Sequence, residues 1–137
     1  MSEKPNNILK RLVLTFILYF ISYNGINCLI IKVFDNFFDY ETFYGLFYGS
    51  IIVIPLLALF LYIINRIFNI NNYMIIIVAI ILLEIITFFI SGISYTYTII
   101  KGLINNTQGI TLKGILLYMN YYTSFILSYL LINRLVK

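Results

Sequence analysis

Long apolar runs, separated by short polar links, set the pattern of this chain. Four such runs cover residues 12–33, 43–64, 73–95 and 114–132. A helix needs about 20 apolar residues to cross the hydrocarbon core of a bilayer, and in lipid a helix satisfies its own backbone hydrogen bonds. The pattern therefore predicts an all-α integral membrane protein, in which four transmembrane helices form a single domain over residues 1–137.

The composition narrows the class of protein further. Hydrophobic residues make up 62% of the chain, charged residues only 10%, and the mean hydropathy is +0.99. A soluble domain carries about 25% charged residues, so lipid must solvate most of this surface, and membrane lipids are expected partners. One cysteine, Cys28, and the lack of histidine exclude an internal disulfide and a metal site of the Cys/His type.

No group of residues in the sequence suggests catalysis. A nucleophile–base pair, a pair of catalytic carboxylates and a glycine loop for phosphate are all missing from the sequence. Basic residues lie at the ends of the apolar runs rather than in one patch, so nucleic acid is not an expected partner. We therefore expect neither an enzyme nor a bound cofactor.

Basic residues also predict the orientation of the spans. With the N-terminus inside, the inner segments hold six basic residues and the outer segments hold three. The inner ones are Lys4, Lys10, Arg11, Arg66, Arg134 and Lys137, and the outer ones are Lys32, Lys101 and Lys113. Cytoplasmic loops carry an excess of Lys and Arg, so both termini are predicted to be cytoplasmic. The isoleucine- and asparagine-rich composition is typical of an AT-rich bacterial genome, which favours the inner (cytoplasmic) membrane.

One carboxylate, Glu84, lies near the centre of the third predicted span. An acidic residue at that depth costs about 2.5–3.5 kcal/mol or more to insert, so Glu84 is expected to face the bundle interior, near span one or span four. Thr87, Ser91 and Tyr95 follow at helical spacing and predict a polar stripe along the same span.

Two amides, Asn24 and Asn120, lie at a similar depth in spans one and four. A site lined by Glu84, Asn24 and Asn120 would suit a proton, a cation or a sugar. The alternative is that Glu84 is neutral and only holds helices together through hydrogen bonds.

Small residues four positions apart predict close helix contacts in two places. Gly45 and Gly49 form one such pair, and Ser124 and Ser128 form the other. Both spacings let neighbouring helices approach closely, but they do not indicate which helix is the neighbour.

A short motif occurs twice, 68 residues apart, as Ile64-Asn65-Arg66 and Ile132-Asn133-Arg134. Because each copy closes an apolar run, the repeat predicts two helical hairpins that form a parallel repeat. Both hairpins then end at the same membrane face. Asn can cap a helix C-terminus, and Arg there interacts with the helix dipole and with anionic headgroups. Arg66 and Arg134 are therefore candidate phosphate-binding residues, with ordinary positive-inside anchors as the alternative.

Segments 61–68 and 129–136, both of the form apolar-Asn-Arg-apolar, together with Lys10-Arg11-Leu12 before the first span, resemble the GtrA-like family of small four-span membrane proteins. The resemblance implies two cytoplasmic termini and a part in moving polyprenyl-phosphate-linked sugars across the membrane for cell-surface polysaccharide glycosylation. It also implies that Asn65, Arg66, Asn133 and Arg134 are the matching positions.

Three functions are open at this point. The first is translocation of a polyprenyl-phosphate-linked sugar, for which four helices would need a homo-oligomer or a larger membrane complex to form a passage. The second is a non-catalytic interaction protein, such as a toxin immunity protein or an accessory subunit. The third, with less support, is a small proton-coupled exporter that uses Glu84.

Overall fold

The computed structural model describes residues 5–105 and 111–136, and this part of the chain is helical apart from short links. The helices are α1 (Pro5–Phe34), α2 (Tyr40–Phe68), α3 (Asn72–Ser91), α4 (Tyr95–Asn105) and α5 (Leu112–Leu135). All except α4 are long and apolar enough to cross a membrane, which confirms the four predicted spans. Lys4 and Lys137, counted above among the inner basic residues, lie outside the described residues.

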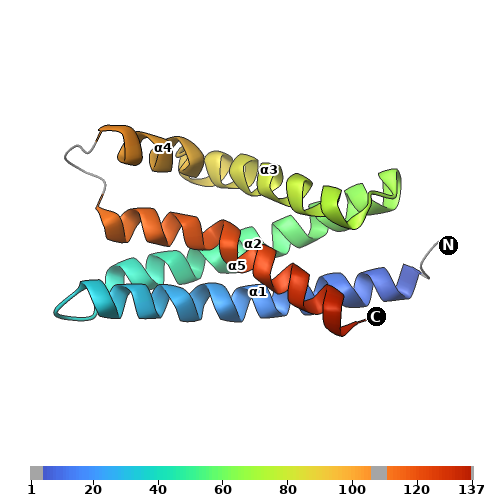
Figure 1. Cartoon of the computed structure of the whole chain (residues 1–137), viewed down its shortest axis with the longest axis horizontal. Helices are drawn as coiled ribbons and strands as arrows, with labels where there is room; N and C mark the ends of the chain where they lie inside the picture. The colour runs from blue at the N-terminus through green and yellow to red at the C-terminus, as the bar shows by residue number, and fades with distance from the viewer. Residues whose placement is uncertain (1–4, 106–110, 137) are drawn as a thin grey trace.

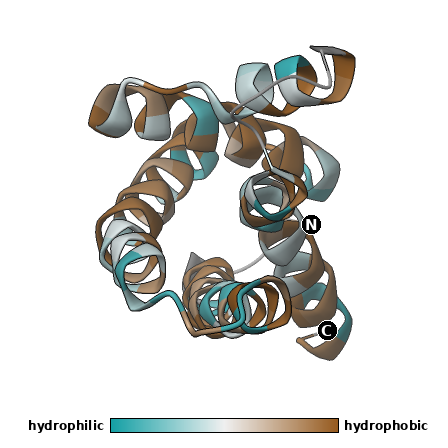
Figure 2. Ribbon diagram, turned by 90° about the vertical axis from the view of Figure 1, so that its left-hand side faces the viewer, coloured by the Kyte–Doolittle hydropathy of each residue, from teal (hydrophilic) through white to brown (hydrophobic). Residues whose placement is uncertain are grey.

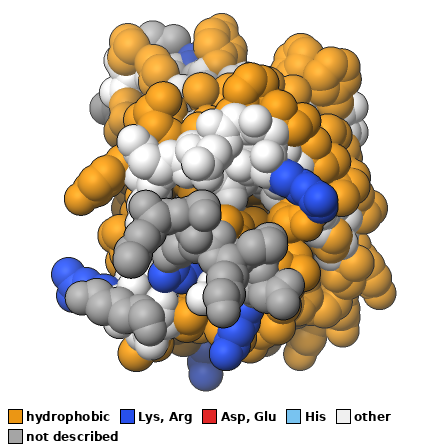
Figure 3. All heavy atoms as spheres, turned by 90° about the vertical axis from the view of Figure 1, so that its right-hand side faces the viewer, with side chains coloured by type: hydrophobic (Ala, Val, Ile, Leu, Met, Phe, Trp, Pro, Cys, Tyr) orange, Lys and Arg blue, Asp and Glu red, His pale blue; other side chains and the backbone are white. Residues whose placement is uncertain are grey.

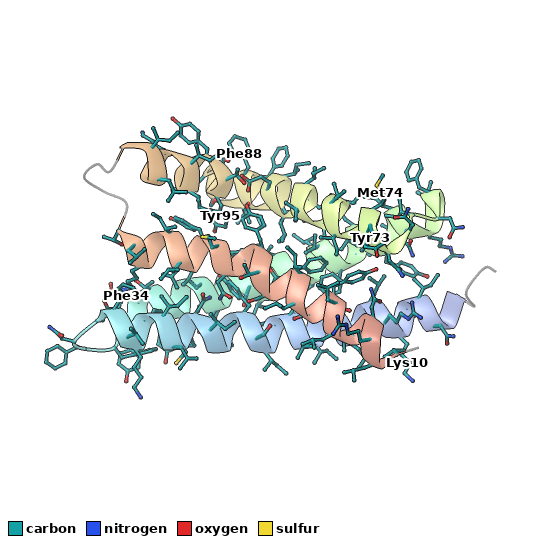
Figure 4. All side chains as sticks on the ribbon, viewed as in Figure 1. Lys10, Phe34, Tyr73, Met74, Phe88 and Tyr95 are labelled. Carbon is teal, nitrogen blue, oxygen red and sulfur yellow. The ribbon has the colours of Figure 1, made fainter. Side chains whose placement is uncertain are left out.

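The four long helices run alternately in opposite directions (Figure 1). α1 begins and α5 ends at one end of the bundle, where the α2–α3 turn also lies, and we call this end the terminal face. The α1–α2 turn lies at the opposite end, which we call the far face. Lys10 and Tyr73 lie toward the terminal face, and Phe34 lies at the far face (Figure 4).

Asparagine shapes the turn between α2 and α3. Asn69 ends α2 in the left-handed conformation, with φ 46, and its N–H donates to the carbonyl of Asn65 at 2.9 Å. Asn71 then accepts a hydrogen bond from the N–H of Met74 at 2.9 Å and so begins α3. Asn adopts the left-handed conformation and caps helices more readily than most residues, so the polar link is shorter than the predicted one and covers residues 69–71 only.

The predicted third span, 73–95, is wrong at its end. The N–H of Gly92 donates to the carbonyl of Phe88 at 2.8 Å, with φ +70 at Gly92, and α3 therefore ends at Ser91. Ser94 accepts from the N–H of Tyr97 at 3.2 Å and begins α4. Tyr95 therefore belongs to α4 rather than to a stripe with Thr87 and Ser91, and the predicted link contains a helix.

Each long helix contributes one buried stripe to a common core. The buried apolar residues of that core include Phe16 and Tyr19 of α1, Leu57 and Leu61 of α2, Ala79 and Leu83 of α3, and Tyr121 and Phe125 of α5. Large apolar side chains such as Ile21, Leu59, Ile81 and Leu127 are instead exposed, and hydrophobic residues dominate the ribbon seen along the bundle (Figure 2). An outer surface of this kind suits lipid, and together with four helices long and apolar enough to cross a bilayer it indicates a helical membrane protein.

The small-residue pairs behave differently from each other. Ser128 faces α1, where its hydroxyl lies 3.3 Å from that of Ser22, so the close contact predicted there is confirmed. A Cβ added at Gly45 would meet nothing within 4 Å, and a Cβ added at Gly49 would lie 3.9 Å from the Tyr121 hydroxyl. α4 contacts both α3 and α5, whereas α1 and α2 are joined by a short turn, so the equivalence of the two hairpins stays a prediction.

Candidate functional site

Glu84 is held by hydrogen bonds from the start of α4 and from α5. The Ser94 hydroxyl and the Thr96 N–H donate to its Oε1 at 2.7 and 2.8 Å, and the Tyr122 hydroxyl donates to its Oε2 at 2.5 Å. We call these four residues the Glu84 cluster. The contact with Tyr122 confirms the expectation that Glu84 lies near span four.

The Glu84 cluster is an anchor for α4. A carboxylate beside the first N–H groups of a helix satisfies donors that have no partner within the helix and interacts favourably with the helix dipole. Glu84 lies about 18 Å from the start of α3 and about 10 Å from its end, at a rise of about 1.5 Å per residue. It therefore lies in the half of α3 nearer the far face, where α4 begins. Tyr95 adds ring contacts between α4 and α5, with centroids 4.7 Å from Tyr118 and 5.0 Å from Tyr121 (Figure 4).

Asn120 joins α5 to α1. Its Nδ2 donates to the Asn27 Oδ1 at 2.9 Å and to the Tyr23 carbonyl at 3.0 Å, and its Oδ1 accepts from Ser124 at 2.5 Å. Asn120 and Asn27 are both buried. Both donors and one acceptor lone pair of the Asn120 amide are thus used inside the protein, which is the arrangement of a residue that holds two helices together.

Asn24 joins α1 to α2 instead. Its Nδ2 donates to the Ser50 hydroxyl at 3.1 Å and to the Phe20 carbonyl at 2.9 Å. Among the described residues, no hydrogen bond links Glu84 with Asn24 or with Asn120. The structure thus places the three predicted site residues in three separate contacts, because each side chain finds partners on a different neighbouring helix.

A polar pocket opens at the terminal face, and all four long helices contribute to it. Its volume is about 270 Å³, which corresponds to the liquid volume of about nine water molecules. The polar lining residues are Arg11 of α1, Asn65 of α2, Asn69 of the turn, Asn72 of α3, and Tyr129 and Asn133 of α5. We call this the asparagine pocket, and apolar side chains such as Ile8 and Leu12 complete its wall.

The asparagine pocket has the chemistry of an anion-binding site with extra hydrogen-bonding groups. Arg11 is the one charged residue among the described lining residues, and a guanidinium matches the geometry of a phosphate. Each amide offers two donors and an acceptor, a set that suits the hydroxyls of a sugar. Tyr129 donates to the Asn72 Oδ1 at 3.2 Å and ties α5 to α3 beside the pocket. Lys and Arg side chains surround this face of the molecule (Figure 3).

The two copies of the repeated motif meet in this pocket, but only through their asparagines. Asn65 and Asn133 line it, whereas Arg66 and Arg134 are exposed and do not. Consecutive helical residues point about 100° apart, so an Asn that faces inward turns the following Arg outward. Arg66 donates to the hydroxyl of Tyr62 on its own helix at 3.2 Å. The positive-inside anchor, the alternative considered for both arginines, fits these positions.

Sequence reasoning did not select Arg11, Asn69, Asn72 or Tyr129 as site residues. One signal for them was present, because the asparagines at 65, 69 and 72 and the arginine at 11 all fall at ends of apolar runs assigned to one membrane side. That signal predicts that these residues lie at one membrane face. It does not predict that they line one cavity, because this depends on how the four helices pack.

Comparison with known proteins adds no relative to this four-span helical membrane protein. No family model, no curated protein and no solved structure matches the chain. The resemblance to the GtrA-like family therefore stays a prediction.

Proposed function

We propose that this protein takes part in moving a polyprenyl-phosphate-linked sugar across the bacterial inner membrane and that the asparagine pocket binds its phosphate-bearing headgroup. The observation that carries the proposal is the convergence of Asn65 and Asn133, from the two copies of the motif, with Arg11 in one polar cavity. A cation supplies affinity for phosphate, and several amides supply hydrogen bonds for sugar hydroxyls.

The proposal also includes the orientation of the protein. The terminal face would lie in the cytoplasm, because Lys10, Arg11, Arg66 and Arg134 lie near the helix ends of that face and cytoplasmic segments carry the excess of Lys and Arg. The far face carries lysine and acid together, and Lys113 is paired with Asp35 at 2.5 Å. In a Cys28→Ser background, a cysteine at Asn36 should react with an impermeant thiol reagent added outside intact cells, and one at Asn69 should not. The reverse result would reject this orientation.

The function itself can be tested in vesicles that contain the purified protein and a radiolabelled polyprenyl-phosphate-linked hexose. Impermeant periodate, added outside, oxidises only sugars exposed on the outer leaflet, so continued oxidation reports movement between leaflets. The wild-type protein should accelerate this process over protein-free vesicles. Arg11→Gln should slow it roughly tenfold, the factor expected for loss of one charge-assisted contact.

The matched control is Lys32→Gln, which removes one positive charge from the other end of the same helix, at an exposed position. It should move the sugar at the wild-type rate. Equal rates for wild type, Arg11→Gln and protein-free vesicles would reject the proposal. The exporter and interaction-protein functions stay predictions, because no feature of the described site specifically supports either.

A further inference from the structure

A second cavity, an open groove between α1 and α2, lies beside the asparagine pocket. It has a volume of about 790 Å³, and every lining side chain except Tyr62 is a hydrocarbon. Ala58 and Pro55 of α2 face Phe16 and Ile17 of α1 across it. The small side chain of Ala58 and the compact ring of Pro55 leave room that larger aliphatic side chains would fill. The volume of the groove therefore depends on these two residues as well as on the distance between α1 and α2.

The groove extends through about one leaflet. Its lining residues on α1 run from Leu9 to Ile21, about 18 Å along the helix at 1.5 Å per residue. Half of the hydrocarbon core of a bilayer is about 15 Å. At its deep end, α1 and α2 are joined by the hydrogen bond between Asn24 and Ser50 at 3.1 Å. An occupant would thus enter from the terminal face and reach no further than about the middle of the membrane.

The groove and the asparagine pocket share a wall at the terminal face. Leu12 lines both cavities, and Arg11, its neighbour in the chain, lines the pocket. On the α2 side, Tyr62 lines the groove and accepts a hydrogen bond from Arg66 at 3.2 Å. The mouth of an apolar groove is thus flanked by two guanidinium groups and opens next to a polar cavity.

This combination matches the two parts of a single amphipathic molecule. We infer that the α1–α2 groove holds the hydrocarbon chain of the lipid whose phosphate is bound in the asparagine pocket. The inference rests on the proposed function and deepens it, because it assigns the lipid chain a defined path. Transfer of a chain from bilayer to groove gains little from hydrophobic burial, so the charged headgroup at Arg11 determines which lipid occupies the groove.

The test is photo-crosslinking with a lipid monophosphate that carries a diazirine in its hydrocarbon chain, added to the full-length protein in phosphatidylcholine nanodiscs. Mass spectrometry of the digested protein locates the cross-links. They should concentrate on residues 9–21 and 51–62, above the level on exposed positions of α3 such as Ile81. A diazirine phosphatidylcholine should label all lipid-facing helices without this preference.

Two variants separate the groove from the pocket. Ala58→Phe fills the groove and should reduce its labelling to the level on α3, with Ala58→Leu as a milder replacement if the larger side chain prevents folding. Gly25→Phe is the matched control, because Gly25 is exposed on α1 outside the groove lining and a Cβ added there meets nothing within 4 Å, and it should leave labelling unchanged. Arg11→Gln should reduce groove labelling by the phosphate lipid roughly tenfold.

The outcomes that contradict the inference are distinct. Equal labelling of the groove by both lipids would make it a place for any membrane lipid, and labelling of residues 9–21 and 51–62 by neither lipid would reject a lipid chain as its occupant. Labelling outside the groove that still depends on Arg11 would reject the groove and keep the headgroup pocket. Groove labelling that Arg11→Gln leaves unchanged would reject the pocket, and with it the proposed function on which this inference rests.

Discussion

The Glu84 cluster and the asparagine pocket both place polar side chains among apolar helices. They differ in what those side chains surround. In the Glu84 cluster, three donors of the protein converge on one carboxylate within 2.5–2.8 Å. In the asparagine pocket, six polar side chains from four helices and one turn surround about 270 Å³ of open volume. The first arrangement leaves no room between its groups, whereas the second encloses an open volume even though Tyr129 and Asn72 are hydrogen-bonded to each other.

The hydrogen-bond partners of a charged residue at membrane depth distinguish a structural role from a functional one. A carboxylate within a transmembrane segment is a functional candidate by default, and Glu84 was the most conspicuous one in the sequence. Its partners show that a carboxylate can be required simply because a helix begins beside it and needs an acceptor. A cavity lined by polar side chains is a better candidate for a binding site than a cluster whose polar groups fill it.

The largest expected effect comes from removing the anchor. Glu84→Ala leaves the Ser94 hydroxyl, the Thr96 N–H and the Tyr122 hydroxyl without their acceptor, so the free energy of unfolding in detergent should fall by about 2 kcal/mol. Glu41→Ala, in the exposed first turn of α2, should cost less than about 1 kcal/mol. Thermal unfolding of the purified variants measures both.

The conservative change distinguishes an anchor from a proton carrier. Glu84→Gln keeps a carbonyl acceptor of similar shape, so it should retain sugar movement and most of the stability. Loss of activity in Glu84→Gln with normal expression and an unchanged melting temperature would contradict the anchor role and favour the proton-coupled function.

Two asparagines on α5 allow a direct comparison of a pocket residue with a residue that joins helices, because Asn133 lines the asparagine pocket and Asn120 contacts α1. Asn133→Leu should weaken binding of a polyprenyl-phosphate-linked sugar several-fold and change stability by less than about 0.5 kcal/mol, because Asn133 lines the pocket and is only half-buried. Asn120→Leu should do the reverse and lower stability by about 1–2 kcal/mol, since it breaks the buried contacts with Asn27 and Ser124. Lipid retention in native mass spectrometry and thermal unfolding read out the two effects. If both variants changed the same quantity, pocket and core would not be separate.

The four spans could be predicted from the sequence because they depend on local composition, and a run of about 20 apolar residues has few alternatives in lipid. The end of α3 could also have been predicted from local sequence, because Gly92 is a typical helix end and Ser94 a typical helix start. The prediction missed both residues because the run 73–95 is apolar along its length. Convergence was not predictable in this way. Asn120 was expected beside Glu84 and instead faces α1, because the rotation of each helix about its axis depends on how all the helices pack.

The exposed arginines should be nearly insensitive to conservative change. Arg66→Lys and Arg134→Lys keep the positive charge at the terminal face, where neither side chain lines the asparagine pocket, so protein level and surface glycan modification should stay near wild type. Arg66→Lys loses the bond to Tyr62, a surface contact of about 0.5–1.5 kcal/mol at most. Loss of glycan modification in either variant at normal protein level would show a bidentate phosphate contact that lysine cannot replace, and would move the headgroup site outward from the pocket.

The smallest expected effect concerns the charges of the far face, where acid and base are paired, in contrast to the basic terminal face. Hydrogen bonds from Thr42 lower the pKa of Asp39 below its ordinary value, and the Lys113 ammonium, 3.6 Å away, acts in the same direction. A carboxylate with a lowered folded-state pKa stabilises the protein fully above the unfolded value of about 3.9, and this contribution is lost as the pH falls through the lower, folded value. Melting temperatures should therefore fall slightly toward about pH 3 in the wild type and less in Asp39→Asn, which keeps an acceptor for the first turn of α2.

The control is Glu41→Gln, at an exposed position two residues further on, which should follow the wild-type profile. An Asp39→Asn profile identical to that of the wild type would mean that ionisation of Asp39 contributes nothing to stability.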